Sequence, residues 1–374
     1  MEQRYHFSPA IATVLCISPG NLYIVTFPGR NQGASFCRIC KNAPYPGGVE
    51  GPRALVILRP VCYNAAMSMT AAGRFAPSPS GYMHMGNLLS MLLAWLDCRA
   101  LGGRMIFRME DLDPARSKDV YKTALAEDLR WLGLDWDEGW PDPAYAQSNR
   151  TAVYEDAFRV LEQKGLVYPC WCSRADRLAA ASAPHPGEAE HDPGCPCARL
   201  SRRERAERER SGRPPAWKLR VPDETVTVDD GHCGPVSQNL AREAGDFIIR
   251  RSDGVFAYQL AVSVDDMLMG VTRVVRGRDL LSSAPRQRFL IETLGGVAPS
   301  YCHGPLLSSG DGKLSKRLGS LSTQVLRQEY RPEELTGKLA QLCGLRDTDA
   351  PVTPRELLDD FDWNRIARQD IPLL

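Results

Sequence analysis

The sequence predicts an α/β protein built on a parallel sheet. Apolar residues recur at helical spacing over 86–101, 118–134 and 151–166, and a short apolar strand is expected at 104–110. Helices that alternate with strands are typical of parallel sheets, because each helix carries the chain back to the start of the next strand. A turn rich in Pro and Gly, residues 74–87, comes immediately before the first of these helices.

The second half of the chain is expected to repeat this pattern. Strands are expected at 246–251 and 256–266, and a helix at 280–296 that ends in two glycines. The segment 170–220 interrupts the pattern with four cysteines and a highly charged stretch. From about residue 323 the sequence predicts a small helical tail.

Residues 1–72 differ from the rest of the chain. They are rich in Pro and Gly and show no sustained helical or strand period. Cys37 and Cys40 form a CxxC pair, but one pair supplies only two of the four ligands of a zinc site, which favours ordinary thiols. We expect a poorly ordered N-terminal extension, or an upstream extension of the reading frame that the working protein lacks.

The composition excludes a polycation and gives no sign of a membrane protein. The net charge is +1, so any contact with nucleic acid needs a local basic patch. There is no run of eighteen apolar residues, and the first residues lack the regions of a signal peptide. We therefore expect a cytoplasmic protein that has no contact with membranes, and clustered cysteines that bind metal rather than form disulfides.

The stretch 201–220 is the most basic part of the chain. A solvated helix with ion pairs four residues apart is the favoured interpretation, and a patch that faces phosphates is the alternative.

Two stretches predict phosphate binding. In 74–87, a glycine-containing turn opens a helix, which exposes backbone N–H groups and the positive end of the helix dipole. Within it, Gly86 allows close approach to the backbone, and His84 is suited to donate to a phosphate. In 308–320, lysines lie in a Gly- and Ser-containing loop, where they can follow charge on a leaving pyrophosphate.

These two stretches resemble the signature motifs of class I aminoacyl-tRNA synthetases. His84-Met85-Gly86-Asn87 resembles the HIGH motif, and KLSKR at 313–317 resembles the KMSKS loop. The stretches RFAPSPSG, FRMEDLD and RGRDLL are similar to the glutamyl branch, and the resemblance covers about residues 73–325. It implies a Rossmann-like catalytic domain with a zinc-containing insertion and a short helical C-terminal tail. The implied segments are the halves of the catalytic domain at 73–169 and 241–322, the insertion at 170–240 and the tail at 323–374.

The resemblance implies that the carboxylate of glutamate attacks the α-phosphate of ATP, which enters with Mg²⁺, and that pyrophosphate leaves. Arginine suits the glutamate pocket because its fork can bind both oxygens of a carboxylate. An arginine at the end of the apolar stretch VVRG, Arg276, also needs a partner to be buried. The implied catalytic residues are His84, Lys313 and Lys316. The implied glutamate-binding residues are Arg74, Phe75, Ala76, Pro77, Ser78, Glu110, Tyr258 and Arg276. The implied ATP-binding residues are His84, Gly86, Asn87 and Lys316.

Two CxC pairs predict a structural zinc site. Cys170 and Cys172 form the first pair, and Cys195 and Cys197 form the second. Four thiolates suit tetrahedral zinc and leave no open position for catalysis. Relatives often have a tyrosine and a single cysteine where this chain has HDPGCPC, so Cys195 is expected to replace the missing ligand. His185 and His191 remain alternative ligands.

Within the glutamyl branch, one group of paralogues is the best match. Only 318–374 follows the KLSKR stretch, which is too short for the anticodon-binding region of a full glutamyl-tRNA synthetase. This shortness and the CxC pairs resemble the paralogues that transfer glutamate to queuosine at the wobble position of tRNA(Asp). The expected partners are then tRNA(Asp) containing queuosine, L-glutamate and ATP, and we expect a monomer. The alternatives are a truncated synthetase that charges tRNA(Glu), and a noncatalytic zinc-stabilised RNA-binding relic.

Overall fold

The computed structural model describes residues 11–18, 21–28, 70–172, 195–309 and 322–373. The chain divides into two compact units, Met1–Tyr63 and Asn64–Leu374. In the first unit, β1 (Ile11–Ser18) pairs with β2 (Asn21–Pro28) in an antiparallel ladder. The sequence analysis did not predict these strands, although both are rich in residues that favour strands. The rest of 1–69, including the Cys37–Cys40 pair, lies outside the described residues.

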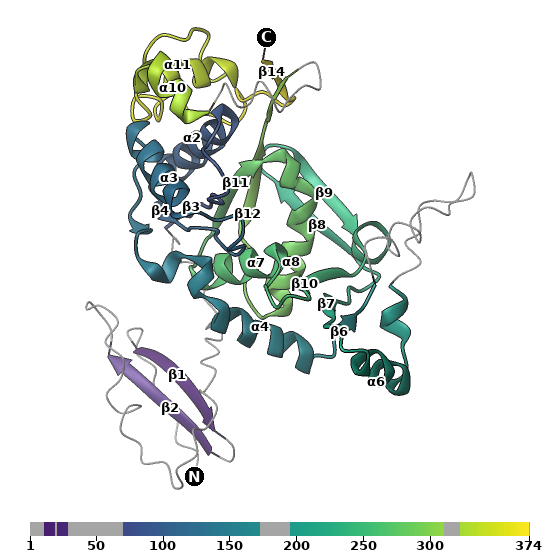
Figure 1. The fold of residues 1–374 in the computed structure, drawn as a ribbon. Coiled ribbons are helices and arrows are strands. Elements are labelled where there is room, and N and C mark those ends of the chain that lie inside the picture. Colours follow the sequence, from purple (N-terminus) through teal and green to yellow (C-terminus); the bar gives the residue numbers. More distant parts are fainter. Residues whose placement is uncertain (1–10, 19–20, 29–69, 173–194, 310–321, 374) are drawn as a thin grey trace. The chain divides into compact units, whose positions relative to one another are not determined.

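The second unit is built on parallel strands, as the sequence predicts (Figure 1). β3 (Ala72–Phe75), β4 (Arg104–Phe107) and β5 (Glu138–Gly139) pair in parallel in that order. The helix α2 (Met85–Ala100) connects β3 to β4, and α3 (Asp119–Trp131) lies between β4 and β5. The expected strand–helix–strand crossovers are therefore present in this half.

A second set of parallel strands lies beside the first. β11 (Arg273–Gly277) pairs in parallel with β12 (Ser300–Gly304), and β12 borders β8 (Thr225–Asp230), also in parallel. β8 pairs with β9 (Gly234–Asn239) in an antiparallel ladder. β11 begins next to β3, where the amide of Thr272 donates to the carbonyl of Ala72 at 3.0 Å. This contact joins the amino ends of β3 and β11, and further along the strands Arg74 reaches the carbonyl of Val275.

The segment 256–266 corrects one prediction, because it forms a helix and not a strand. The helix α7 (Tyr258–Leu268) buries the consecutive residues 260–266. Over 256–265, large apolar residues alternate with small or polar ones, as they do in a strand. A short apolar run of this kind cannot be distinguished from a buried strand by its pattern. The helix α8 (Ala284–Thr293), by contrast, lies within the range predicted as helical.

The four cysteines lie next to a small antiparallel sheet. Its central strand β7 (Ala216–Leu219) pairs with β6 (Val167–Cys170) and with β10 (Phe247–Arg250). The helix α4 (Thr151–Gln163) leads into β6, and Gly165, at a φ of 71°, ends the helix as predicted. The charged helix α6 (Arg202–Arg210) precedes β7. Short helical turns lie at η1 (Pro143–Tyr145), η2 (Gln147–Asn149), η3 (Pro196–Arg199), η4 (Leu240–Ala244) and η5 (Arg278–Ser283).

The C-terminal segment packs onto α2. It begins with α10 (Thr323–Glu329) and α11 (Pro332–Leu342), as the sequence predicts, and continues as turns. Buried side chains of this segment share the main core with the leucines of α2, and the indole of Trp363 donates to Asp97 at 2.6 Å. The last strand, β14 (Ile371–Leu373), pairs in parallel with β13 (Leu307–Ser309). None of the described helices is long and apolar enough to cross a membrane.

Candidate active site

A cavity of about 360 Å³ opens at the carboxyl ends of the parallel strands. Ligands of open α/β sheets bind at this edge. Arg74 comes from β3, Glu110 follows β4, Arg276 comes from β11, and Tyr258 begins α7. The lining residues are Arg74, Ala76, Ser78, Ser90, Met91, Glu110, Tyr258, Val275, Arg276 and Leu280. The structure therefore brings together six of the residues predicted to bind glutamate.

Phe75 and Pro77 were also predicted to bind glutamate, but neither lines the cavity. Side chains of an extended segment alternate between two faces, so Arg74, Ala76 and Ser78 share one face and Phe75 and Pro77 share the other. Phe75 is fully buried, and its ring lies edge-on to Phe107 with centroids 6.3 Å apart. Its side chain contributes to the core beneath the cavity.

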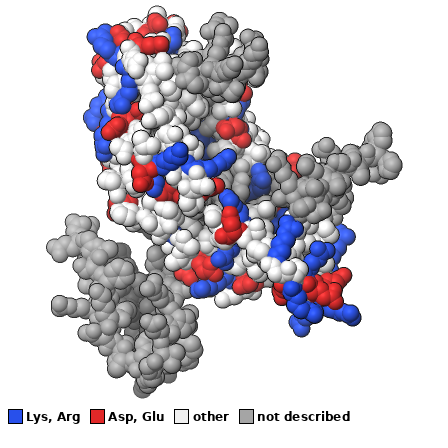
Figure 2. Space-filling view, viewed as in Figure 1, with Lys and Arg blue, Asp and Glu red and all other residues white. Residues whose placement is uncertain are grey.

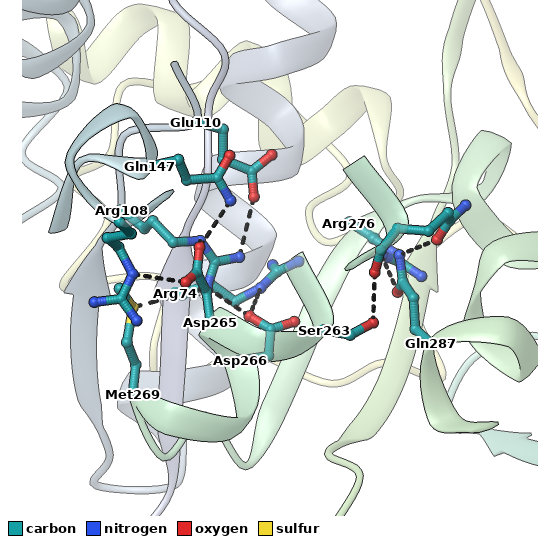
Figure 3. Close-up of polar contacts among 12 residues, drawn as sticks. Arg74, Arg108, Glu110, Gln147, Ser263, Asp265, Asp266, Met269, Arg276 and Gln287 are labelled. Carbon is teal, nitrogen blue, oxygen red and sulfur yellow. Dashed lines mark hydrogen bonds and ion pairs between the residues drawn. The ribbon is translucent and has the colours of Figure 1, made fainter. Parts of the chain in front are cut away.

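Arg74 is held rigidly in the cavity wall (Figure 3). Its Nη1 donates to the carbonyl of Val275 at 3.0 Å, and its Nε lies 3.6 Å from Oδ1 of Asp266. Only 5% of the side chain is exposed, and burial lowers the pKa of Arg74. Nη2 makes no hydrogen bond to a described residue, so it remains available to a ligand.

A buried cluster of charges lies behind Arg74. Arg108 is fully buried, with Nη1 2.7 Å from Oδ1 of Asp266 and Nη2 3.0 Å from Oε1 of Glu110. Burial alone would lower the pKa of Arg108, but the neighbouring carboxylates outweigh it and raise that pKa. Burial raises the pKa of Glu110, although Arg108 and Arg74 oppose the rise. One oxygen of Glu110 is therefore bound by the protein, while the residue also lines the cavity.

Asp265 anchors α7 to the neighbouring elements. It accepts hydrogen bonds from Gln147 Nε2 at 2.8 Å, Tyr154 OH at 2.9 Å and Arg150 Nε at 2.7 Å. Charge-assisted bonds of this kind are stronger than neutral ones. They fix the helix that begins with Tyr258 at the cavity.

On the opposite wall, Arg276 is bound by three partners. It donates to Gln287 Oε1 at 2.8 Å (Figure 3). It also donates to His303 Nε2 at 2.9 Å and to the carbonyl of Leu280 at 3.2 Å. The burial of this arginine is thus compensated by hydrogen bonds, as its place in an apolar strand requires.

The predicted ATP-binding residues lie at the N-terminus of α2. The amide of His84, the residue before the helix, donates to Oδ1 of Asn87 at 3.1 Å. A side chain at Gly86 would come within 3.2 Å of the His84 ring, so glycine allows this packing. Burial lowers the pKa of His84, and its Nδ1 is buried without a hydrogen-bond partner among the described residues. Lys313 and Lys316 lie outside the described residues.

The two CxC pairs form a single four-sulfur cluster. The sulfur atoms of Cys170, Cys172, Cys195 and Cys197 all lie within 4.8 Å of one another. The distance from Cys195 to Cys170 is 3.4 Å, and Cys172 lies 3.7 Å from Cys195 and 3.6 Å from Cys197. Tetrahedral zinc with bonds of about 2.3 Å places its sulfurs about 3.8 Å apart, so the cluster fits zinc.

The thiols of this cluster would lose protons on binding a metal. Burial raises the pKa of Cys170 to about 11, so this thiol is protonated at neutral pH when no metal is bound. Zinc binds the thiolate, and its binding is therefore coupled to proton release. Both cysteines of the second pair are in the cluster, whereas the alternative ligands His185 and His191 lie outside the described residues.

Comparison with known proteins shows the family. Residues 71–369 match a family model described as "tRNA synthetases class I (E and Q), catalytic domain", where E and Q stand for glutamate and glutamine. The chain belongs to this class I synthetase family. The match includes the cavity, the cysteine cluster and most of the C-terminal segment.

Relatives of this synthetase carry two different names. A glutamyl-Q tRNA(Asp) synthetase of Symbiobacterium thermophilum is 48% identical over 80% of this chain and 94% of its own length. Glutamate–tRNA ligase 2 of Acidithiobacillus ferrooxidans is 44% identical over 80% of this chain, but over only 64% of its own length. A crystal structure of a glutamate tRNA ligase of Elizabethkingia meningosepticum matches 82% of this chain and 67% of its own, with a TM-score of 0.68 and 25% identity.

The sequence analysis of this synthetase missed Arg108, Asp265 and Asp266. Asp265 and Asp266 lie at the end of a stretch that was assigned to a strand, where they would not point at β3. Arg108 lies directly after the apolar residues of β4, and the argument used for Arg276 applies equally to it. An arginine beside an apolar strand was therefore a sign in the sequence that Arg108 needs a buried partner.

The helix α6 of this synthetase fits the favoured interpretation of the basic stretch. It has no buried residues, and Ser201 and Glu204 cap its N-terminus. Arg203 and Glu207 form an ion pair one turn apart at 3.1 Å. Figure 2 shows basic and acidic side chains mixed at this end of the molecule. The arrangement is that of a solvated helix.

Proposed function

We propose that this chain activates L-glutamate with ATP and transfers the glutamyl group to queuosine at the wobble position of tRNA(Asp). The observation that carries the choice of acceptor is the relative named glutamyl-Q tRNA(Asp) synthetase, which is 48% identical over 94% of its length. The cavity supports the choice of glutamate, because two buried arginines and one carboxylate match a ligand with two carboxylates and an ammonium group.

In the first step, the α-carboxylate of glutamate attacks the α-phosphorus of ATP. A new P–O bond forms, the bond to the pyrophosphate breaks, and glutamyl-adenylate results. Glu110 binds the ammonium group, while Arg74 and Arg276 bind carboxylate oxygens. The enzyme supplies no nucleophile, so its contribution is to position two anions and to stabilise the developing charge.

The phosphates of ATP are assigned to the N-terminus of α2. His84 and the backbone at Gly86 contact them there, and Asn87 supports the turn through its bond to the His84 amide. Mg²⁺ enters with ATP. Lys313 and Lys316, in the stretch outside the described residues, are assigned to the leaving pyrophosphate.

In the second step, a hydroxyl of queuosine's cyclopentene ring attacks the glutamyl carbonyl, and AMP leaves. We assign a structural zinc ion to the four-cysteine cluster, where it would order the segment 170–240 beside the RNA. We propose that the protein acts as a monomer. We propose that the reaction takes place in the cytoplasm.

We propose that the two halves of the catalytic domain are residues 73–169 and 241–322. One qualification concerns the insertion at 170–240, since β8 and β9 extend the sheet of β11 and β12. The part of the insertion that is separate from that sheet contains the cysteine cluster, α6 and β7.

Two RNA fragments test the acceptor. One is an anticodon stem-loop of tRNA(Asp) that contains queuosine, and the other is an acceptor-stem minihelix of tRNA(Glu). Labelled glutamate should be transferred to the stem-loop and not to the minihelix. Transfer to the minihelix alone would favour an enzyme that charges tRNA(Glu). The 44% identical relative is named a glutamate–tRNA ligase. If neither fragment is labelled and no AMP forms, the noncatalytic alternative is favoured.

A further inference from the structure

Arg276 is a buried cation whose direct partners are all neutral. Its Nε donates to an imidazole, and its two terminal nitrogens donate to an amide oxygen and to a backbone carbonyl. Among the described residues it forms no ion pair. Arg108, by comparison, is paired directly with carboxylates. A buried positive charge without a carboxylate beside it favours an anionic ligand.

A carboxylate does lie nearby, but His303 separates it from Arg276. Nδ1 of His303 is 2.6 Å from Oδ2 of Asp230, and both side chains are fully buried at this contact. Oδ1 of Asp230 accepts from the backbone amides of His232 at 3.0 Å and Cys233 at 2.8 Å. Asp230 is therefore fixed, and its negative charge reaches Arg276 only through the imidazole ring.

These contacts define the tautomer of His303. Nε2 must accept from Arg276, because a guanidinium has no acceptor, so the ring proton lies on Nδ1 and is donated to Asp230. A doubly protonated ring could not accept this bond and would repel Arg276. Burial lowers the pKa of His303, and the positive charges of Arg276 and Arg74 act in the same direction, whereas Asp230 opposes them. The neutral ring is thus the stable form at pH 7.

The other side of the guanidinium is fixed by a chain of amides. Oε1 of Gln287 faces Arg276, because a guanidinium can only donate, and its Nε2 therefore donates to Oε1 of Gln259 at 3.0 Å. Gln259 in turn donates to the hydroxyl of Ser283 at 3.0 Å. Each amide therefore has one orientation. A guanidinium has five N–H donors. The described residues use three of them, and Arg276 lines the cavity.

We propose that His303 is a positioning residue of the glutamate site, a neutral spacer that orients Arg276 and keeps the carboxylate of Asp230 away from it. The inference rests on the proposed function. The two unused donors of Arg276 are then directed to one carboxylate of glutamate, and the positive charge is not neutralised before the substrate arrives.

Substitutions of His303 that differ in reach test this inference. Glutamine can place an amide oxygen near the position of Nε2, whereas the shorter asparagine reaches only the position of Nδ1. His303→Asn leaves the buried Nε–H of Arg276 without an acceptor, and we expect the KM for glutamate to rise about ten- to a hundredfold. His303→Gln should restore most of the affinity. The KM for ATP should stay unchanged in both variants.

Tyr301→Phe is the matched control on the same strand. Tyr301 is buried beside His303, and its hydroxyl has no hydrogen-bond partner among the described residues. This variant should keep the wild-type KM for glutamate. If His303→Asn does not fold, Gln287→Met removes a second neutral acceptor of Arg276 and should raise the same KM.

Three results would overturn the inference while wild type still activates glutamate. The first is an unchanged KM for glutamate in His303→Asn. The second is a rise in the KM for ATP of His303→Asn that equals the rise for glutamate. The third is a KM for glutamate in His303→Gln that is as high as in His303→Asn. A wild-type protein and a Tyr301→Phe control that both fail to form glutamyl-adenylate would instead overturn the proposed function, and the inference with it.

Discussion

Glu110 is the side chain whose charge links this site to pH. Its carboxylate is shared between Arg108 and the cavity, and burial raises its pKa. The ammonium group of glutamate needs the ionised form. As the pH falls through the raised pKa of Glu110, the carboxylate gains a proton and loses the charge proposed to bind the ammonium group of glutamate.

Glu110→Gln should therefore raise the KM for glutamate about ten- to a hundredfold, the effect of losing a charge-assisted hydrogen bond. It should also remove the rise of KM at acid pH that we predict for the wild type. Steady-state adenylate formation between mildly acid and neutral pH measures both effects. Glu127→Gln, on the exposed face of α3, is the control. An unchanged KM in Glu110→Gln would show that this carboxylate does not bind the ammonium group.

Asp230 gives a second prediction, on stability. The hydrogen bond from His303 and the backbone amides outweigh burial and lower the pKa of Asp230 to about 2, whereas an unfolded aspartate has a pKa of about 3.9. A carboxyl with a lowered folded-state pKa stabilises the protein above about pH 4, and this stabilisation is lost as the pH falls towards 2.

Asp230→Asn should lower the free energy of unfolding at pH 7 by about 1–3 kcal/mol. The difference from wild type should shrink between about pH 4 and pH 2. Urea unfolding over this range measures it, with the exposed neighbour Asp229→Asn as the control. A difference that is constant with pH would contradict the assigned role of the Asp230 charge.

At the scale of elements, the cysteine cluster joins the end of β6 to η3. Cys170 and Cys172 lie at the end of β6, and Cys195 and Cys197 lie at the start of η3 and within it. The residues between the two pairs lie outside the described ranges. A bound zinc ion would cross-link these two elements and stabilise the small sheet of β6, β7 and β10.

Cys170→Ser should therefore lose zinc and lower the melting temperature together. Metal analysis of the purified protein and thermal unfolding measure the two effects. Cys233→Ser is the matched control, because Cys233 is a half-buried thiol outside the cluster. Stoichiometric zinc retained in Cys170→Ser would exclude that residue as a ligand.

Elements were predictable from the sequence where the pattern of apolar residues agrees with the structure, and not where it imitates another element. The helices α2, α3 and α4 were expected close to their observed positions because one stripe of each is polar or a glycine ends it. The helix α7 was missed because large apolar residues alternate with small or polar ones over 256–265, which imitates the pattern of a strand. The motif stretches predicted Arg74, Glu110 and Arg276, but not the partners that fix them. Asp230, Gln287 and His303 lie outside the motif stretches, and the fold brings them to Arg276.

At the scale of the whole molecule, the chain consists of two compact units of unequal size. The larger unit, Asn64–Leu374, contains the cavity, the cysteine cluster and all of the stretch that matches the family. All the residues that line the cavity belong to the larger unit.

Deleting residues 1–66 should therefore leave kcat and the KM values for glutamate and ATP unchanged. Adenylate formation by the shortened and full-length chains is the comparison, with thermal unfolding to verify that the larger unit is intact. Loss of activity in a shortened chain that still unfolds cooperatively would show that the first segment takes part in catalysis.

The central claim, that the glutamyl group goes to queuosine, is tested most directly with two pools of tRNA. One pool comes from cells that make queuosine, and the other comes from cells that cannot. The protein is incubated with each pool, ATP, Mg²⁺ and labelled glutamate. We predict label on the first pool only. Equal label on both pools would contradict the claim and indicate an enzyme that charges tRNA(Glu).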